Sequence, residues 1–297
     1  MPLLASTPPF SLDLCLESGQ AFGWRKVDGA WAGAIGQTAF LLRGVPNGLE
    51  WDASGPAGQA SMQLQHYLAL GEDHPTIVRQ FPRDPFLMKA VRCCGGLRVL
   101  RQDPWECLAG FILSSTKQIA HIQQIWRNVA LRWGTPMKPC GGDSSPIIHS
   151  FPGPSTLARR TEAELRGCAM GFRAPYLLEA ARAVDGGTLN LETLRSLSTG
   201  EARGRLMALH GVGRKIADCV LLFSLGKSEA FPVDTWILKV LRHVYFRGKR
   251  KVTAKRLVQF AAVHFGPFGG HAQQYLFHYA RMNPGFAREK MRRIKNP

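Results

Sequence analysis

The sequence has few acidic residues and no long apolar run. Its 21 aspartate and glutamate residues stand against 38 lysine and arginine residues, which gives a formal net charge of +17. An excess of this sign and size is typical of proteins that bind a polyanion such as nucleic acid. Because no stretch of about 18 apolar residues occurs, we expect no helix that crosses a membrane. The first residues also lack the pattern of a signal peptide.

Cysteine is present, but in no grouping that predicts a disulfide framework or a zinc site. The chain has seven cysteines, an odd number, and no CxxC spacing. We therefore expect reduced thiols in an intracellular protein. Internal repeats and long low-complexity runs are also lacking, which excludes a repeat array.

The first hundred residues alternate between apolar and polar side chains over short segments, as half-buried strands do. Asp28-Gly29 is a typical hairpin turn between two such segments. Glycine and proline are frequent over 46–58, which predicts a loop, and helices are predicted over 59–70 and 82–92. The predicted strands are 11–16, 22–24, 31–35, 39–43 and 99–101.

From residue 104 onward, apolar residues recur at intervals of three and four, which predicts helices. The sequence thus predicts an α+β protein, in which an N-terminal antiparallel β-sheet domain (1–103) packs on a larger, mainly α-helical domain (104–297). The predicted helices, apart from a Gly/Pro/Ser-rich connection at 136–154, are 104–129, 155–160, 162–169, 175–185, 191–197 and 214–225.

The most informative stretch is LMALHGVGRKIADCVLLFSLGKSEAFPVDTW, residues 206–236. Gly211 and Gly213 interrupt the helical pattern, since two glycines in three residues favour positive φ angles or close backbone approach. The next predicted helix carries Lys215 in its first turn. A helix N-terminus offers free N–H groups that suit a phosphate, and its dipole destabilises an ammonium ion. A half-buried lysine there is favoured as a neutral amine, which is a nucleophile.

Asp234 follows the helix that starts after Gly213, and the chain can fold back so that this carboxylate approaches Lys215. The two residues would then form a nucleophile and an acid–base or electrostatic partner beside a phosphate-binding hairpin. A plainer alternative remains open at this point. It makes Lys215 a surface lysine that binds phosphate, and Asp234 the N-cap of a helix that begins before Trp236.

The segments 209–218 and 231–234 resemble the helix-hairpin-helix (HhH-GPD) DNA glycosylase superfamily, and Lys215 followed by Asp218-Cys219 resembles its 8-oxoguanine DNA glycosylase/AP lyase branch. The resemblance implies excision of 8-oxoguanine from duplex DNA and nicking of the abasic site through a Schiff base on Lys215, with Asp234 as catalytic partner. The alternatives are a glycosylase of this superfamily for another damaged base, such as an alkylated purine, and a non-catalytic hairpin protein that binds DNA.

The resemblance also implies residues that bind the flipped base. The carbonyl of Gly19 would accept a hydrogen bond from N7–H of the oxidised base, and Gln273 would read its Watson–Crick edge. Phe277 and Cys219 would stack on its two faces, with Cys219 one helical turn after Lys215. Taken singly, these residues are equally typical of a turn glycine, a solvated glutamine, a core phenylalanine and a buried free cysteine.

Further residues are implied to contact DNA near the start of the predicted helical domain. Thr116, Lys117, Gln118 and His121 occupy the run that fills the gap left by the flipped base and reads the opposite base. The better-known eukaryotic members have asparagines in this run and an arginine in place of His121. Because neutral histidine lacks the donor fork of arginine, we expect a relaxed preference for cytosine opposite the lesion.

The remaining implied DNA contacts are a wedge and the hairpin itself. Phe172 would insert as an aromatic wedge, Arg173 would contact the orphaned base, and the amides around Gly211 and Gly213 would hold a phosphate. On its own, Phe172 is more typical of a core residue, and 114–118 of a polar bend at the surface.

No cofactor is implied as a requirement. Relatives bind a monovalent cation through hairpin carbonyls, which corresponds here to the backbone of Met207, Leu209 and Val212, with no side-chain metal ligand. No cysteine follows Cys219, so the C-terminal iron–sulfur loop of some relatives is absent from this sequence. The expected partner is double-stranded DNA that contains oxidised guanine, bound by a monomer without membrane association.

Overall fold

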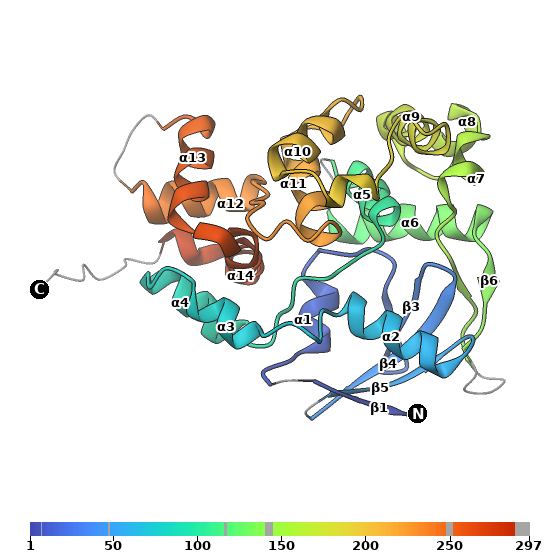
Figure 1. Ribbon diagram of the computed structural model, residues 1–297, viewed down its shortest axis with the longest axis horizontal. Helices are drawn as coiled ribbons and strands as arrows, with labels where there is room; N and C mark the ends of the chain where they lie inside the picture. The colour runs from blue at the N-terminus through green and yellow to red at the C-terminus, as the bar shows by residue number, and fades with distance from the viewer. Residues whose placement is uncertain (7, 47, 116–117, 140–144, 248–251, 289–297) are drawn as a thin grey trace, which may run out of the picture.

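The computed structural model describes residues 1–288 apart from 7, 47, 116–117, 140–144 and 248–251. Its N-terminal part holds a five-stranded antiparallel sheet of order β1-β5-β4-β3-β2, and most of the rest of the described chain is helical (Figure 1). The predicted α+β class is therefore confirmed. The strands are β1 (Leu3–Ala5), β2 (Arg25–Val27), β3 (Ala30–Ile35), β4 (Thr38–Val45), β5 (Gly48–Ala53) and a separate pair, β6 (Pro136–Met137) with β7 (Ile148–His149).

Helices cover the sheet and make up the larger part of the molecule (Figure 1). They are α1 (Leu12–Glu17), α2 (Ala57–Tyr67), α3 (His74–Arg79), α4 (Pro85–Cys93), α5 (Pro104–Leu113), α6 (Ile119–Trp133), α7 (Pro154–Ala158), α8 (Glu162–Arg166), α9 (Ala174–Asp185), α10 (Thr199–Met207), α11 (Arg214–Phe223), α12 (Thr235–Val240), α13 (Ala254–His264) and α14 (Gly269–Met282). Short turns of other helix types are η1 (Gly171–Arg173), η2 (Thr193–Arg195), η3 (Leu241–Tyr245), η4 (Gly266–Phe268) and η5 (Pro284–Arg288).

The hairpin predicted at Asp28-Gly29 is confirmed. Both residues have positive φ angles, 47° and 76°, and they join β2 to β3. Two consecutive positive φ angles define the type I′ turn, whose twist matches that of antiparallel strands. The strands predicted over 31–35 and 39–43 correspond to β3 and β4, which pair in antiparallel register.

The strand predicted over 11–16 is wrong, because this segment is helix α1. Ser11 caps the helix by accepting a hydrogen bond from the backbone N–H of Leu14 at 3.3 Å. Leu12, Cys15 and Leu16 are buried, and their spacing of three and four residues is helical. The apparent alternation was therefore a short piece of helical periodicity.

Three other segments of the N-terminal part also differ from the prediction. Residues 22–24 form no strand, because β2 begins only at Arg25. The predicted loop 46–58 contains β5, which pairs with both β1 and β4. The predicted strand 99–101 joins neither of the sheets that the described residues form. Its backbone groups are bonded elsewhere, since Leu100 N–H donates to the side chain of Gln20 at 2.9 Å and Arg101 N–H donates to the carbonyl of Tyr67 at 2.9 Å.

In the helical part, the helix predicted over 191–197 is reduced to the single turn η2.

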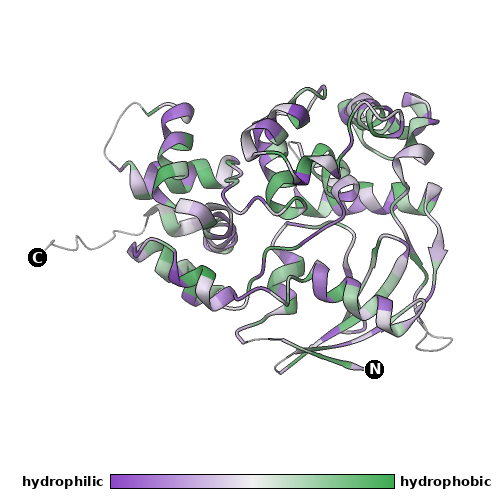
Figure 2. Ribbon diagram, viewed as in Figure 1, coloured by the Kyte–Doolittle hydropathy of each residue, from purple (hydrophilic) through white to green (hydrophobic). Residues whose placement is uncertain are grey.

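Three hydrophobic clusters hold the described chain together. One packs the sheet against α1 and α2, a second packs α5 against α9 and α11, and a third joins α3 and α4 to α12–α14. Figure 2 colours the centre of the molecule, where α5 meets α11, mainly as hydrophobic. Helices α3 and α4 thus precede the predicted boundary at residue 103 in sequence but pack with the last helices in space (Figure 1). The boundary stays a prediction.

Candidate active site

The hairpin between α10 and α11 has a geometry that requires its central glycine. Gly211 has a φ of +80°, and a β-carbon there would lie 2.4 Å from the ring of Tyr176. Leu209 accepts a backbone hydrogen bond from Val212 at 3.1 Å, which closes the turn. Gly213 occupies the N-cap of α11, and within the described chain no side chain caps this helix. The first N–H groups of α11 are therefore left for an external acceptor.

Lys215 projects from the first turn of α11 toward the end of α5. Its Nζ donates a hydrogen bond to Ser114 Oγ at 2.9 Å and lies 5.0 Å from the centroid of the Phe111 ring. Ser114 Oγ in turn donates to the carbonyl of Phe111 at 2.7 Å. The amine is half-buried and is held by one hydroxyl and one aromatic face, rather than by a carboxylate.

Asp234 is the N-cap of α12, with Oδ1 accepting from the backbone N–H of Ile237 at 2.8 Å. The plainer alternative for this residue is therefore confirmed as far as capping is concerned. Burial raises the pKa of Asp234, and the Ile237 N–H and the positive charge of Lys215 act in the opposite direction. Lys215 and Asp234 both lie in the described part of the chain, and they form no direct ion pair there. They are nevertheless close enough for their charges to interact.

The thiol of Cys219 lies one turn along α11 from Lys215. Its side chain is 2% exposed, and burial raises its pKa to about 12, so the group is a neutral thiol at pH 7. Lys215 and Asp234 both contribute to its electrostatic environment. The structure therefore brings the three residues predicted from 206–236 into one neighbourhood.

Gly19 lies in a turn that only glycine favours, and this turn packs on α14 to form a wall of residues from the two ends of the chain. Its φ is +78°, and a β-carbon would meet Ile119 Cδ1 at 2.8 Å and Phe277 Cε1 at 3.4 Å. The turn is tied to α14, because Gln274 Nε2 donates to the carbonyl of Ser18 at 3.0 Å. Gln273, one turn before Phe277 on α14, is 3% exposed, and its Oε1 is buried without a hydrogen-bond partner among the described residues.

Arg281 belongs to the same wall and was missed by the sequence analysis. A β-carbon on Gly19 would lie 3.4 Å from its Nη1, and its guanidinium is 5.7 Å from the centroid of the Phe277 ring. Nη2 donates to the carbonyl of Glu17 at 2.6 Å, whereas Nη1 is buried without an acceptor among the described residues. A sequence signal existed, since Gln273, Phe277 and Arg281 are spaced by four along one helix face.

The residues predicted to contact DNA differ in their exposure to solvent. Gln118 precedes α6 and His121 lies in its first turn, and both are exposed. Phe172 is 49% exposed, so it is not a core residue. Arg173 is 2% exposed and donates to the carbonyls of Ser115 at 2.9 Å and Met170 at 3.0 Å. Thr116 and Lys117 lie outside the described residues.

A row of rings connects the exposed Phe172 to the hairpin. Phe172 meets Tyr176 edge to face at a centroid distance of 6.2 Å, and Tyr176 meets His210 at 4.7 Å. The Tyr176 ring also packs on Gly211. A change in the hairpin backbone would therefore displace this ring and alter its packing against Phe172.

The described residues contain no group of three or more histidine, cysteine or acidic side chains that could hold a metal ion. The part of the chain that the structure describes also has no helix long and apolar enough to cross a membrane. The backbone cation site predicted at Met207, Leu209 and Val212 stays a prediction.

The fold and this neighbourhood match known protein families. Residues 109–262 match the family model described as "HhH-GPD superfamily base excision DNA repair protein", and residues 2–108 match "8-oxoguanine DNA glycosylase, N-terminal domain". The chain therefore belongs to the HhH-GPD superfamily of base excision DNA repair proteins, with an N-terminal domain of the 8-oxoguanine DNA glycosylase type.

Individual relatives cover nearly the whole chain. It is 31% identical to "N-glycosylase/DNA lyase OGG1" of Arabidopsis thaliana, over 93% of this chain and 79% of that one. It is 28% identical to a "Probable N-glycosylase/DNA lyase" of Methanothermobacter thermautotrophicus, over 92% and 94%. Among solved structures, the 8-oxoguanine glycosylase/lyase of Clostridium acetobutylicum, in complex with double-stranded DNA containing cytosine opposite 8-oxoG, aligns with a TM-score of 0.85 and 33% identity over 93% of each chain.

Proposed function

We propose that this protein is a bifunctional DNA repair glycosylase that excises 8-oxoguanine from duplex DNA and nicks the resulting abasic site. The observation that carries the proposal is the placement of Lys215. Its amine lies at the uncapped start of a helix, held by Ser114 and within electrostatic reach of the half-buried Asp234. Glycosylase and AP lyase activity are also what the printed names of the relatives state.

The amine and the carboxylate have complementary roles in the chemistry. Lys215 Nζ bonds to C1′ of the damaged nucleotide as the glycosidic bond breaks, and the electrons of that bond leave with the base, which takes up a proton. Asp234 stabilises the positive charge that develops on the sugar. Loss of a proton from Nζ and opening of the sugar ring give a Schiff base. Removal of a C2′ proton then expels the phosphate at C3′ and nicks the strand.

The flipped base is bound by the wall that contains Gly19 and Phe277. Buried polar groups are normally hydrogen-bonded, so the unpartnered Oε1 of Gln273 and Nη1 of Arg281 fit a ligand that supplies a donor and an acceptor. The edges of an oxidised purine carry both N–H groups and carbonyl oxygens. Phe277 and the neutral Cys219 thiol stack on the two faces of its ring, and the Gly19 carbonyl accepts from N7–H.

DNA is held by the surface around the active site. The N–H groups at Gly211, Gly213 and the start of α11 bind backbone phosphate. Phe172 enters the base stack, and Gln118 and His121 contact the gap and the opposite base. Thr116 and Lys117 are assigned to DNA binding from the sequence alone. Contact between Arg173 and the orphaned base requires its guanidinium to leave the carbonyls of Ser115 and Met170.

The other finer points follow from this activity. The protein acts as a monomer on double-stranded DNA, without a required cofactor and with a monovalent cation at the carbonyls of Met207, Leu209 and Val212. It is located with the DNA that it repairs, at the nucleoid of a prokaryote or in the nucleus of a eukaryote.

Single-turnover cleavage of matched duplexes tests the proposal. Three duplexes carry 8-oxoguanine, an alkylated purine or undamaged guanine at one position, and products are separated with and without alkali treatment. We expect a strand break without alkali in the 8-oxoguanine duplex alone. Cleavage of the alkylated duplex instead would assign the enzyme to another lesion, and binding without any base release would leave a non-catalytic hairpin protein.

A further inference from the structure

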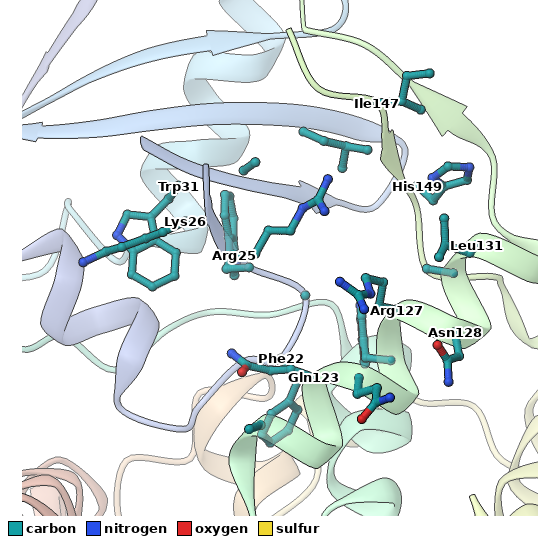
Figure 3. Close-up of a pocket in the computed structure, with 18 of the residues that line it drawn as sticks. Phe22, Arg25, Lys26, Trp31, Gln123, Arg127, Asn128, Leu131, Ile147 and His149 are labelled. Atoms are coloured by element: carbon teal, nitrogen blue, oxygen red, sulfur yellow. The ribbon is translucent and has the colours of Figure 1, made fainter. Parts of the chain in front are cut away.

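A cleft of about 790 Å³ lies between the sheet and α6, and the active-site residues described above do not line it. Strands β2 and β3 form one side, α6 forms the other, and β7 closes one end (Figure 3). The cleft therefore joins the N-terminal sheet to a helix whose first turn carries the exposed His121.

Positive charge from two separate elements converges on this cleft. Arg25 on β2 and Arg127 on α6 are exposed, and Figure 3 shows both side chains extending into the space between strand and helix. Neither arginine has a carboxylate partner among the described residues. Glu17, the one acid among the described lining residues, is paired with Lys26 at 3.0 Å. An anion would complement the charge of two guanidinium groups that have no carboxylate partner at this cleft.

The floor and rim of the cleft suit a nucleotide chain better than a small inorganic ion. Trp31 and Trp126 are buried, with 6% and 9% of each residue exposed, and their indoles form part of the floor, where Trp126 stacks on Phe151 at a centroid distance of 3.9 Å. Gln124 and Asn128 contribute amide groups along α6. Arginines with aromatic and amide neighbours bind backbone phosphate, the apolar faces of sugars and bases, and base edges together.

The cleft continues the predicted DNA surface along α6. His121, Gln124 and Asn128 are spaced by three and four residues and so share one face of the helix. At 1.5 Å per residue, Arg127 lies about 9 Å along the axis from His121. Phosphates of one strand are spaced by about 3.4 Å along a duplex axis, so this distance spans two to three phosphates.

We propose that this cleft is a second DNA-binding site, in which Arg25 and Arg127 hold backbone phosphates of the undamaged strand beyond the base opposite the lesion. The proposal rests on the proposed function, because His121 faces the opposite base only if the lesion is bound at Lys215. It assigns to the N-terminal sheet a direct part in binding the strand that is not cut.

Removal of the undamaged strand on one side of the lesion provides the test. Equilibrium binding is measured with a full lesion duplex and with two partial duplexes, in which the undamaged strand is cut back on either side of the lesion to within one or two nucleotides. We expect Arg25→Gln and Arg127→Gln each to weaken binding of the full duplex about tenfold and to reduce the slope of log affinity against log salt by about one. On one of the partial duplexes both losses should disappear.

Arg43→Gln is the matched control, since Arg43 is an exposed arginine on β4 of the same sheet and does not line the cleft. It should leave binding of the full duplex within twofold of wild type. The proposal would be overturned if Arg25→Gln and Arg127→Gln lost the same affinity on all three DNAs, or lost none on the full duplex. Excision at saturating protein should be unchanged in Arg43→Gln, and a wild-type protein without excision would instead refute the proposed function.

Discussion

The hydroxyl of Ser114 connects the amine of Lys215 to the end of α5. It accepts a hydrogen bond from Nζ at 2.9 Å and donates its own proton to the carbonyl of Phe111 at 2.7 Å. With its proton used in this way, the oxygen can only accept from the lysine. The orientation of the amine therefore depends on a residue that the sequence motif did not single out.

Ser114→Ala should slow single-turnover excision and Schiff-base formation by roughly 10- to 100-fold. A hydrogen bond to a charged group contributes about 1.5–3 kcal/mol, and about 1.4 kcal/mol corresponds to a factor of ten. Ser115→Ala is the control, because Ser115 Oγ donates to the carbonyl of Ile112 at 3.4 Å. If the two variants cleave at the same rate, Ser114 does not position the amine.

Asp234 combines a structural and a proposed catalytic role in one carboxylate. As an N-cap it stabilises α12, but burial raises its pKa, so the ionised form is disfavoured in the folded protein. A carboxyl whose pKa is higher in the folded than in the unfolded state lowers stability as the pH rises through the interval between the two pKa values. The cost is present at neutral pH and vanishes below the ordinary pKa of a carboxyl.

Asp234→Asn should therefore raise the Tm at pH 7 while lowering the excision rate about a hundredfold or more. Asparagine keeps the cap and removes the charge of the half-buried carboxylate. The gain in Tm should disappear as the pH falls below about 4. Asp73→Asn, at the exposed N-cap of α3, should leave excision unchanged. A gain in Tm that is the same at pH 4 and pH 7 would show that ionisation of Asp234 is not its cause.

At the scale of single elements, the hairpin between α10 and α11 has the tightest sequence requirement. Gly211→Ala introduces a β-carbon at a φ of +80° and 2.4 Å from the Tyr176 ring. We expect a loss of about 2–4 kcal/mol in the free energy of unfolding, measured in urea, together with weaker DNA binding. Gly204→Ala, inside α10 with open space around the new β-carbon, should instead stabilise by about 0.5–1 kcal/mol. Equal changes in the free energy of unfolding in Gly211→Ala and Gly204→Ala would contradict this account of the hairpin.

The elements that the sequence predicted well are those with long periodic patterns or specific turn residues. Helices α5, α6, α9 and α11 follow the apolar spacing of three and four, and Asp28-Gly29 forms the expected hairpin turn. The six-residue helix α1 was misassigned, because a segment of that length fits both periods almost equally well. Strand β5 was hidden by flanking glycine and proline, and its pairing with β1 joins residues far apart in sequence.

The candidate site also has a part that local sequence predicts and a part that depends on contacts between distant segments. Gly211, Lys215 and Asp234 lie within one short stretch, so local sequence was sufficient to propose them together as a site. The contact between the Gly19 turn and α14 joins opposite ends of the chain, and without the family resemblance no local pattern would have connected them. The unpartnered Nη1 of Arg281 depends on packing around it, which sequence spacing does not report.

At the scale of the whole molecule, the sheet domain and the helical part share packing and hydrogen bonds. His74 Nε2 and Tyr275 Oη are 2.7 Å apart, and Phe86 meets Tyr279 edge to face at a centroid distance of 5.4 Å. Gln274 reaches back to Ser18 beside Gly19. Helix α14 therefore contacts both α3–α4 and the turn that contains Gly19.

We expect the full chain to unfold in one cooperative thermal transition, because neither part can lose its structure without exposing the cluster that α3, α4 and α14 share. Differential scanning calorimetry checks this through the ratio of calorimetric to van't Hoff enthalpy, which should be close to one. Two resolved transitions would mean that the sheet domain and the helical part unfold independently.

The central claim is that Lys215 is the nucleophile, and covalent trapping tests it most directly. Wild-type protein, Lys215→Gln and Lys227→Gln are each incubated with the same 8-oxoguanine duplex and borohydride, which reduces a Schiff base to a stable adduct. Lys227 is the matched control, since its Nζ donates to the carbonyls of Arg195 at 2.9 Å and Leu197 at 2.5 Å. The account predicts adducts with wild type and Lys227→Gln and none with Lys215→Gln, which should still bind DNA. An adduct that persists in Lys215→Gln would contradict it.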